Sequence, residues 1–309
     1  RLPFAKPVDD VTGLSQAIRV LMGCPFLNGL RARGGSECRR SRRDPVTVAA
    51  VSAPEDDLTA TQRRALRIEI AVVLAVTFAL SAYTALLSLI EGVLLGLSGQ
   101  TVALNPQRSA FGLIDLGLNL ASFFSNCWRG GALAIYLLWR SGLRPPAAVG
   151  LGRIRWRADV LGGIGLATLI GVPGLALYQI ARILGGQRSV EPAELNDTWW
   201  RIPPVLLLLS FGNGWAEEVV VVGFLLTRLR QLRVNPPWTA LIASSLLRGA
   251  YHLYQGVRRG PGQSRHGLVF GYAWQRTGRL WPLIIAHTMI DAVAFVGYSL
   301  LAGHLGWLR

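Results

Sequence analysis

The chain carries a small set of ionisable side chains inside segments that are otherwise apolar, all in its last third. Charged groups in a membrane-length apolar segment are costly to keep there, and where they occur they usually serve a function. A carboxylate and an imidazole beside a carbonyl group can activate a water molecule for hydrolysis. The set therefore indicates a polar site for hydrolysis, metal binding or proton transfer. Its members are Glu217, Glu218, Arg248, His252, His287 and Asp291.

Spacing assigns two of these groups to one helix face. His287 and Asp291 are four residues apart, so in a helix their side chains lie on the same face about one turn apart. There they can hydrogen-bond each other, orient a water molecule or bind a metal ion. Glu217 and Glu218 are adjacent, so they point about 100° apart and cannot both face one site. One glutamate is expected to act as a base and the other to have a structural role.

The residues alone leave a hydrolase and a proton- or ion-coupled transporter equally open. Both classes use acids and histidines buried between membrane helices. A transporter would need a continuous polar path to the cluster. Such a path could begin at Glu91 or Asp115, two more acids that lie in apolar segments. A hydrolase would instead need a cavity that is closed at one end.

Apolar stretches separated by polar, arginine-containing loops must position these side chains. We expect an all-α fold, a polytopic membrane helical bundle of about seven or eight transmembrane helices with the catalytic core in the last four. The segment VRRGPGQSRHG (257–267) is polar, so it is expected to form a loop that contains His266, before a short or partly re-entrant helix. The expected helices cover 68–98, 111–139, 158–184, 203–230, 236–256, 266–276 and 281–302.

The chain divides into a tail and a membrane domain. Residues 1–62 are polar, rich in turn formers and basic at RRSRRDP (39–45), and are expected to be a poorly ordered tail. Because the chain begins with Arg, a second interpretation places the natural start near Val46 to Val51. Residues 63–309 are expected to form one integral membrane domain with its motif core at 203–302.

The charge distribution indicates lipid rather than nucleic acid. The chain has 32 Lys and Arg against 17 Asp and Glu, a net charge of +15, yet charged residues make up only 16% of it and hydrophobic residues 51%. Arginines such as Arg140, Arg144 and Arg153 lie between the apolar stretches, as in loops beside anionic headgroups. We expect membrane lipid and no nucleic acid among the partners. The location is expected to be a plasma (inner) membrane, with the N-terminus in the cytoplasm.

Three segments resemble the motifs of a known family. They are EEVVVVGFLLTRL (217–229), SSLLRGAYHLYQG (244–256) and RTGRLWPLIIAHTMIDAVAF (276–295). In order and spacing they are similar to the EExxxR, FxxxH and HxxxN or HxxxD motifs of the CPBP family, the CAAX-processing and bacteriocin-processing intramembrane proteases, also called Abi proteins. The resemblance covers about 203–295 and implies that the chain cleaves a membrane-associated or prenylated peptide or protein.

The resemblance also implies roles for the residues. Glu217 would activate water and then protonate the leaving amine, while His252 and His287 would hold that water or stabilise the oxyanion. Asp291 would complete the polar cluster beside His287. The sequence requires no cofactor; a divalent metal such as zinc, if bound, would take His252, His287 and either Glu217 or Asp291 as ligands.

Two positions depart from the family pattern. Val222 stands where the family has Arg, and Arg248 stands where it has Phe. The family Arg would share a helix face with Glu218, whereas Arg248 lies four residues before His252, on the face toward the site. We hypothesise that Arg248 replaces the missing cation and pairs with Glu218. The alternative is a non-catalytic family member that acts as a membrane scaffold or self-immunity protein.

Overall fold

The structure is a computed structural model, and it describes residues 58–96, 101–183, 189–191, 204–255 and 259–297. The predictions for the N-terminal tail and for the natural start fall almost wholly outside these residues. Within them, the chain is helical except for loops and one short parallel pair, β1 (Thr101–Ala103) with β2 (Ser189–Glu191). The predicted all-α fold is therefore confirmed.

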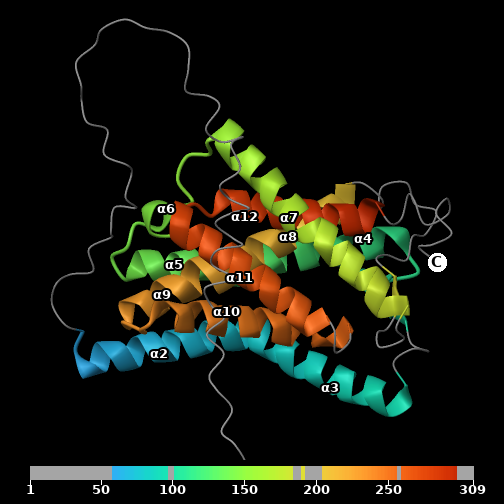
Figure 1. Cartoon of the computed structure of the whole chain (residues 1–309), viewed down its shortest axis with the longest axis horizontal. Coiled ribbons are helices and arrows are strands. Elements are labelled where there is room, and N and C mark those ends of the chain that lie inside the picture. Colours follow the sequence, from blue (N-terminus) through green and yellow to red (C-terminus); the bar gives the residue numbers. More distant parts are fainter. Residues whose placement is uncertain (1–57, 97–100, 184–188, 192–203, 256–258, 298–309) are drawn as a thin grey trace, which may run out of the picture. The chain divides into compact units, whose positions relative to one another are not determined.

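The helices of the first half form three stretches (Figure 1). The first begins at the N-cap Thr59, whose hydroxyl accepts a hydrogen bond from the Gln62 backbone in a capping box. A short helix, α6 (Pro145–Ala148), stands between the second stretch and the third. The stretches are α2 (Ala60–Leu74), η2 (Ala75–Ala79) and α3 (Leu80–Leu95); then α4 (Gly112–Ser125), η4 (Asn126–Ala132) and α5 (Leu133–Arg140); then α7 (Trp156–Ile183).

The second half contains the motif helices. One continuous segment, Leu206–Gln231, is called the central rod here, and a later segment turns at η7 (Leu253–Gln255). The rod consists of α8 (Leu206–Glu217), η6 (Glu218–Phe224) and α9 (Leu225–Gln231). The other helices are α10 (Pro237–Tyr251), α11 (Arg259–Thr277), α12 (Trp281–Ala292) and η8 (Val293–Gly297).

Length and composition mark this as an integral membrane protein. Among the described residues, Ala60–Leu95, Trp156–Leu177 and the central rod are long and apolar enough to cross a membrane, and Trp281–Gly297 is a shorter apolar helix. The first two are only 11% buried over their most apolar windows, whereas the rod is 67% buried. Leu80 and Leu94 of α3, for example, are 65% and 80% exposed. Such apolar outer faces suit contact with lipid, and the rod forms the interior.

The other helices surround the central rod. Its valines 219–222 are fully buried. Three of them, Val219, Val220 and Val222, belong to one apolar cluster that includes Leu138 of α5, Phe270 of α11 and Ile284 of α12. Helix α12 packs on α7 and α8, while α10 packs on α11 and also on α3 (Figure 1). The motif helices therefore meet at the middle of the rod, where the two glutamates lie.

Two ion pairs fix helix ends around this core. Arg228 at the end of the rod is fully buried and bonds Glu69 of α2 at 2.5 Å and the Leu137 carbonyl oxygen at 3.0 Å. Arg279, in the loop before α12, bonds Asp159 of α7 at 2.5 Å. The hydrogen bonds from Arg279 to Asp159 raise the pKa of Arg279, so this pair stays charged at physiological pH.

Helix α11 is longer than expected. The prediction of a polar loop at 257–267 is wrong, because the helix already begins at Arg259 and includes His266. The glycine and proline residues stand in its first turn, where Pro261 breaks no intrahelical hydrogen bond. At Gly267 the helix lies so close to α10 that a Cβ atom there would be 2.9 Å from Ser245 Cα. His266 is consequently a buried helical residue, only 5% exposed, rather than a loop residue.

Candidate active site

Glu217 and Glu218 lie in the central rod where the α-helix changes to the π-helix η6. Short π-helical turns inside longer helices are frequent at functional sites. The two side chains point into different surroundings, since Glu218 is fully buried and Glu217 is 12% exposed. The adjacent acids are thus separated as the helical geometry predicts.

Glu218 is paired on two sides by buried groups. Arg248 Nη2 of α10 donates to Glu218 Oε1 at 2.7 Å, and His287 Nδ1 of α12 lies 2.7 Å from the same oxygen. Arg248 is itself fully buried, with its guanidinium 5.8 Å from the Phe270 ring centre. A buried carboxylate needs such partners, because an uncompensated charge is costly in an apolar interior. The cation missing at Val222 is therefore supplied to Glu218 by Arg248, across the helix interface.

Residues of the same neighbouring helix, α10, also bind Glu217. The Tyr251 hydroxyl donates to Glu217 Oε2 at 2.6 Å, and Arg248 Nη1 lies 3.4 Å from that oxygen. One guanidinium thus lies between both glutamates. Sequence reasoning missed Tyr251, although its place three residues after Arg248 puts it on the same helix face.

His252 ends α10 and is half-buried. Its Nδ1 lies 2.9 Å from the Arg248 carbonyl oxygen. Because a carbonyl oxygen only accepts, Nδ1 carries the proton and Nε2 keeps the lone pair. The ring packs on Tyr251, with the ring centres 4.7 Å apart, and it is near enough to Glu217 for the two groups to interact electrostatically. In its neutral form, His252 therefore has its basic nitrogen at Nε2, on a ring that lies near Glu217.

Asp291 and His287 form the pair expected from their spacing. His287 Nε2 lies 3.8 Å from Asp291 Oδ1, so the imidazole stands between Glu218 on one side and Asp291 on the other. Asn213 Nδ2 donates to Asp291 Oδ2 at 3.4 Å, and Asn213 Oδ1 accepts from Asn126 at 2.9 Å. Asn213 was not predicted, although its place one turn before Glu217 on the rod puts it on the same face.

A cavity of about 160 Å³ opens beside Glu217, and we call it the Glu217 cavity. Its wall comes from η2 and α3 on one side, from η4 on another and from the central rod at its end. A space of this size with polar walls holds several water molecules. The lining residues are Val76, Thr77, Phe78, Ser81, Ser125, Asn126, Arg129, Gly130, Asn213, Ala216 and Glu217.

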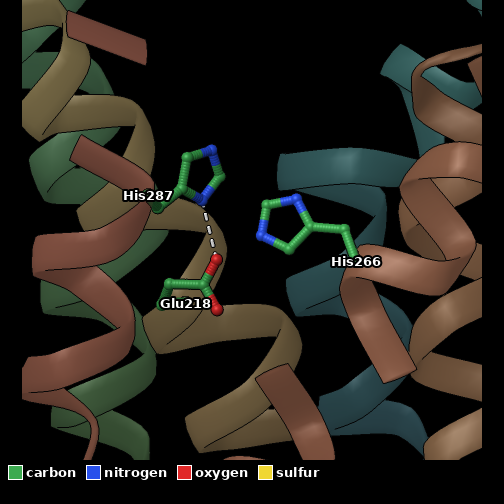
Figure 2. Close-up of side chains that lie close together, drawn as sticks. All are labelled: Glu218, His266 and His287. Atoms are coloured by element: carbon green, nitrogen blue, oxygen red, sulfur yellow. Dashed lines mark hydrogen bonds and ion pairs between the residues drawn. The ribbon is translucent and has the colours of Figure 1, made fainter. Parts of the chain in front are cut away.

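On the other face of the rod, Glu218, His266 and His287 form what we call the buried cluster. Figure 2 shows their side chains pointing toward one another, and their ligand atoms lie within 4.8 Å of one another. Among the described residues, His266 Nε2 and Glu218 Oε2 have no hydrogen-bond partner. Two imidazoles and a carboxylate are ligands that zinc accepts. Arg248 opposes a second cation there, because its guanidinium is bonded to the same carboxylate.

The buried cluster differs from the metal-ligand set expected from the sequence. His287 is in both, but Glu218 and His266 take the places assigned to His252 and to Glu217 or Asp291. The sequence signal for His266 is its spacing of four residues from Phe270, which puts the two side chains on one face of α11. The two rings are in edge-on contact, with their centres 4.2 Å apart. That signal is usable only if the helix is known to begin before residue 266.

The two acids of the first helices stay outside the site. Glu91 is exposed on α3, and Asp115 accepts hydrogen bonds from the backbone N–H groups of Arg108 and Ser109 at the start of α4. Asp115 therefore stabilises the loop that leads into α4. Neither acid is among the residues that line the Glu217 cavity.

The fold and the site together define a class: an integral membrane helical protein with an acid and histidine centre enclosed by its motif helices. Residues 199–293 match the model of the family described as Rce1-like, type II CAAX prenyl endopeptidase Rce1-like. The match confirms the resemblance to the CPBP proteases, and because the family is one of proteases, it agrees with the expectation of an enzyme. Comparisons with curated proteins and with solved structures give no match.

Proposed function

We propose that the chain is an intramembrane endopeptidase that hydrolyses a peptide bond of a membrane-associated or prenylated peptide or protein, using water activated by Glu217. One observation carries the proposal. Glu217 lines a cavity that can hold water, whereas its neighbour Glu218 is fully buried against Arg248 and His287. Only Glu217 can therefore meet water and substrate together.

In the proposed first step, a water molecule lies between Glu217 and the basic Nε2 of His252. Glu217 takes one proton from this water, and the hydroxide oxygen forms a bond to the carbonyl carbon of the substrate. The carbonyl oxygen becomes an oxyanion, which His287 stabilises electrostatically rather than by lining the cavity, because it is near enough to Glu217 for the two groups to interact. Asp291 orients that imidazole from one helical turn away. Glu217 then gives its proton to the amide nitrogen as the C–N bond breaks, so an amine and a carboxylic acid leave the site.

Arg248 and Tyr251 act as positioning residues in this scheme. The guanidinium neutralises Glu218, so that the net charge next to Glu217 stays small. The Tyr251 hydroxyl fixes one oxygen of Glu217 and leaves the other to face the cavity. Because Arg248 supplies a cation to Glu218, the departure at Val222 no longer favours a non-catalytic scaffold.

The proposed setting is a plasma (inner) membrane with the N-terminus in the cytoplasm. Support comes from the arginines of the loop between α5 and α7, such as Arg144 and Arg153, which suit the anionic cytoplasmic leaflet. The substrate would be a peptide or protein that the membrane itself holds beside the cavity.

The test is hydrolysis of a fluorogenic prenylated peptide by the full chain in lipid nanodiscs. Glu217→Gln is expected to lower kcat by about 10²–10⁴-fold, the usual contribution of a positioned base. The matched control is Glu91→Gln, which changes an exposed acid outside the site and is expected to leave the rate unchanged. Equal rates for the wild type and Glu217→Gln would overturn the proposal and favour the non-catalytic scaffold instead.

A further inference from the structure

The oxyanion of the proposed reaction needs a hydrogen-bond donor in the wall of the Glu217 cavity. His287 and Asp291 are not among the residues that line this cavity, and an ionised carboxylate such as Asp291 accepts hydrogen bonds but donates none. An oxyanion is stabilised most strongly by an N–H group that is already aimed at its position when the reaction begins. The donor must therefore come from another residue of the wall.

Asn213 has the right place on the central rod. It lies in α8 one helical turn before Glu217, so the two side chains share a face of the rod, and both line the cavity. Its side chain is half-buried, so part of it can contact a bound substrate. A substrate carbonyl beside Glu217 would therefore also meet the amide of Asn213.

Two neighbours fix the orientation of this amide. Asn126 Nδ2 of η4 donates to Asn213 Oδ1 at 2.9 Å, and Asn213 Nδ2 donates to Asp291 Oδ2 at 3.4 Å. The opposite orientation would set two oxygen atoms against each other at Asp291, so the carboxylate selects the nitrogen end. An amide nitrogen carries two N–H groups, and among the described residues Asp291 is the one acceptor that Asn213 Nδ2 has. The second N–H group is left for an oxygen atom in the cavity.

Close helix contacts hold the rod on both sides of Asn213. A Cβ atom on Gly212 would lie 3.0 Å from Phe123 Cδ2 of α4, and one on Gly214 would lie 3.0 Å from Thr288 Oγ1 of α12. The rod approaches both helices this closely because the two glycines lack side chains. The backbone that carries the amide is thereby fixed before substrate binds, which is the condition for strong stabilisation of a transition state.

We propose that Asn213 is a catalytic residue that donates a hydrogen bond from Nδ2 to the oxyanion. This inference rests on the proposed function and deepens it. As the hydroxide oxygen bonds to the carbonyl carbon, the carbonyl oxygen gains negative charge, and the hydrogen bond from Asn213 strengthens. When the C–N bond breaks, the C=O double bond forms again and the charge disappears, so Asn213 keeps both its protons throughout. The hydrogen bond is stronger in the transition state than in the substrate complex, and it therefore raises kcat more than it tightens substrate binding.

The test measures hydrolysis of the fluorogenic prenylated peptide by the full chain in nanodiscs. Asn213→Leu has nearly the native side-chain shape but no donor, and it is expected to lower kcat by about 10²–10³-fold while KM changes by less than about 3-fold. The matched control is Asn119→Leu, which removes a buried asparagine bonded to Asp115 within α4, outside the site. It should leave kcat unchanged. A wild-type kcat in Asn213→Leu would overturn the Asn213 proposal alone, whereas failure of the proposed function would appear as full activity of Glu217→Gln.

A second measurement separates transition-state stabilisation from a structural role. It compares, by calorimetry, binding of the uncleaved peptide and of a phosphinate analogue, whose tetrahedral phosphorus carries an oxygen in place of the oxyanion. Asn213→Leu should bind the phosphinate about 10²-fold more weakly than the wild type does. On the Glu217→Gln background, which prevents cleavage, Asn213→Leu should change binding of the peptide by less than about 3-fold. Equal weakening of both ligands, or unchanged binding of the phosphinate, would overturn the proposal.

Discussion

The pair of Arg248 and Glu218 offers the sharpest test of how this site is assembled. Both side chains are fully buried, and their closest atoms are 2.7 Å apart. Arg248→Phe, which restores the aromatic residue of the family motif, leaves Glu218 with His287 alone. Removing one partner of a buried ion pair costs about 3–5 kcal/mol, because the remaining charge is left uncompensated. We expect a loss of this size in the free energy of unfolding and a loss of hydrolysis.

The decisive comparison returns the cation to its family position. Val222 is fully buried on the central rod, one turn after Glu218, so Val222→Arg places a guanidinium on the face of that acid. The double variant with Arg248→Phe is expected to regain at least half of the lost stability and measurable activity, whereas Val222→Arg alone should be destabilised by a second buried cation. Unfolding in a denaturing detergent and hydrolysis of the prenylated peptide measure both effects. A double variant no better than Arg248→Phe would refute the reasoning that the two positions share one role.

Three further predictions follow from the site. Tyr251→Phe removes the hydrogen bond to Glu217 and should lower kcat by roughly 10-fold while changing stability by about 1 kcal/mol or less; a pH–rate profile would detect the altered carboxylate, and an unchanged profile would contradict the role. Dialysis against a strong zinc chelator should leave hydrolysis unchanged, because Arg248 already neutralises the buried cluster; loss of activity that zinc restores would show the opposite. Gly267→Val should destabilise the protein by about 2 kcal/mol or more, because its side chain would overlap Ser245; a thermal unfolding scan with Gly262→Val, at an open position, is the control.

Local periodicity explains what the sequence could predict. Long apolar stretches fix the helices, and the spacing of four between His287 and Asp291 fixes their shared face. The pairing of Arg248 with Glu218 was also within reach, because a buried acid that lacks its usual cation needs another from a neighbouring helix. The prediction succeeded where the demand for charge compensation left few candidates.

Non-local packing explains what the sequence could not predict. His266 was assigned to a loop because the segment around it is polar, yet the helix begins at Arg259 and includes it. The glycine and proline of that segment do not prevent the helix, since they stand in its first turn. The burial of this imidazole depends on the contact between Gly267 and Ser245, two residues from different helices. The change to a π-helix at Glu218, which sets where each glutamate points, likewise has no simple sequence signal.

The relocated cation changes what the site depends on. With an arginine at position 222, the central rod would neutralise Glu218 by itself, and the acid would be satisfied before any other helix packed. With Arg248 in its place, Glu218 stays uncompensated until α10 packs against the rod, and the same helix brings Tyr251 to Glu217. The cation, the hydroxyl and the imidazole of His252 therefore arrive on one element. Assembly of the site is coupled to the packing of α10 on the rod and on α11, so substitutions at that interface should reduce activity in proportion to their effect on stability.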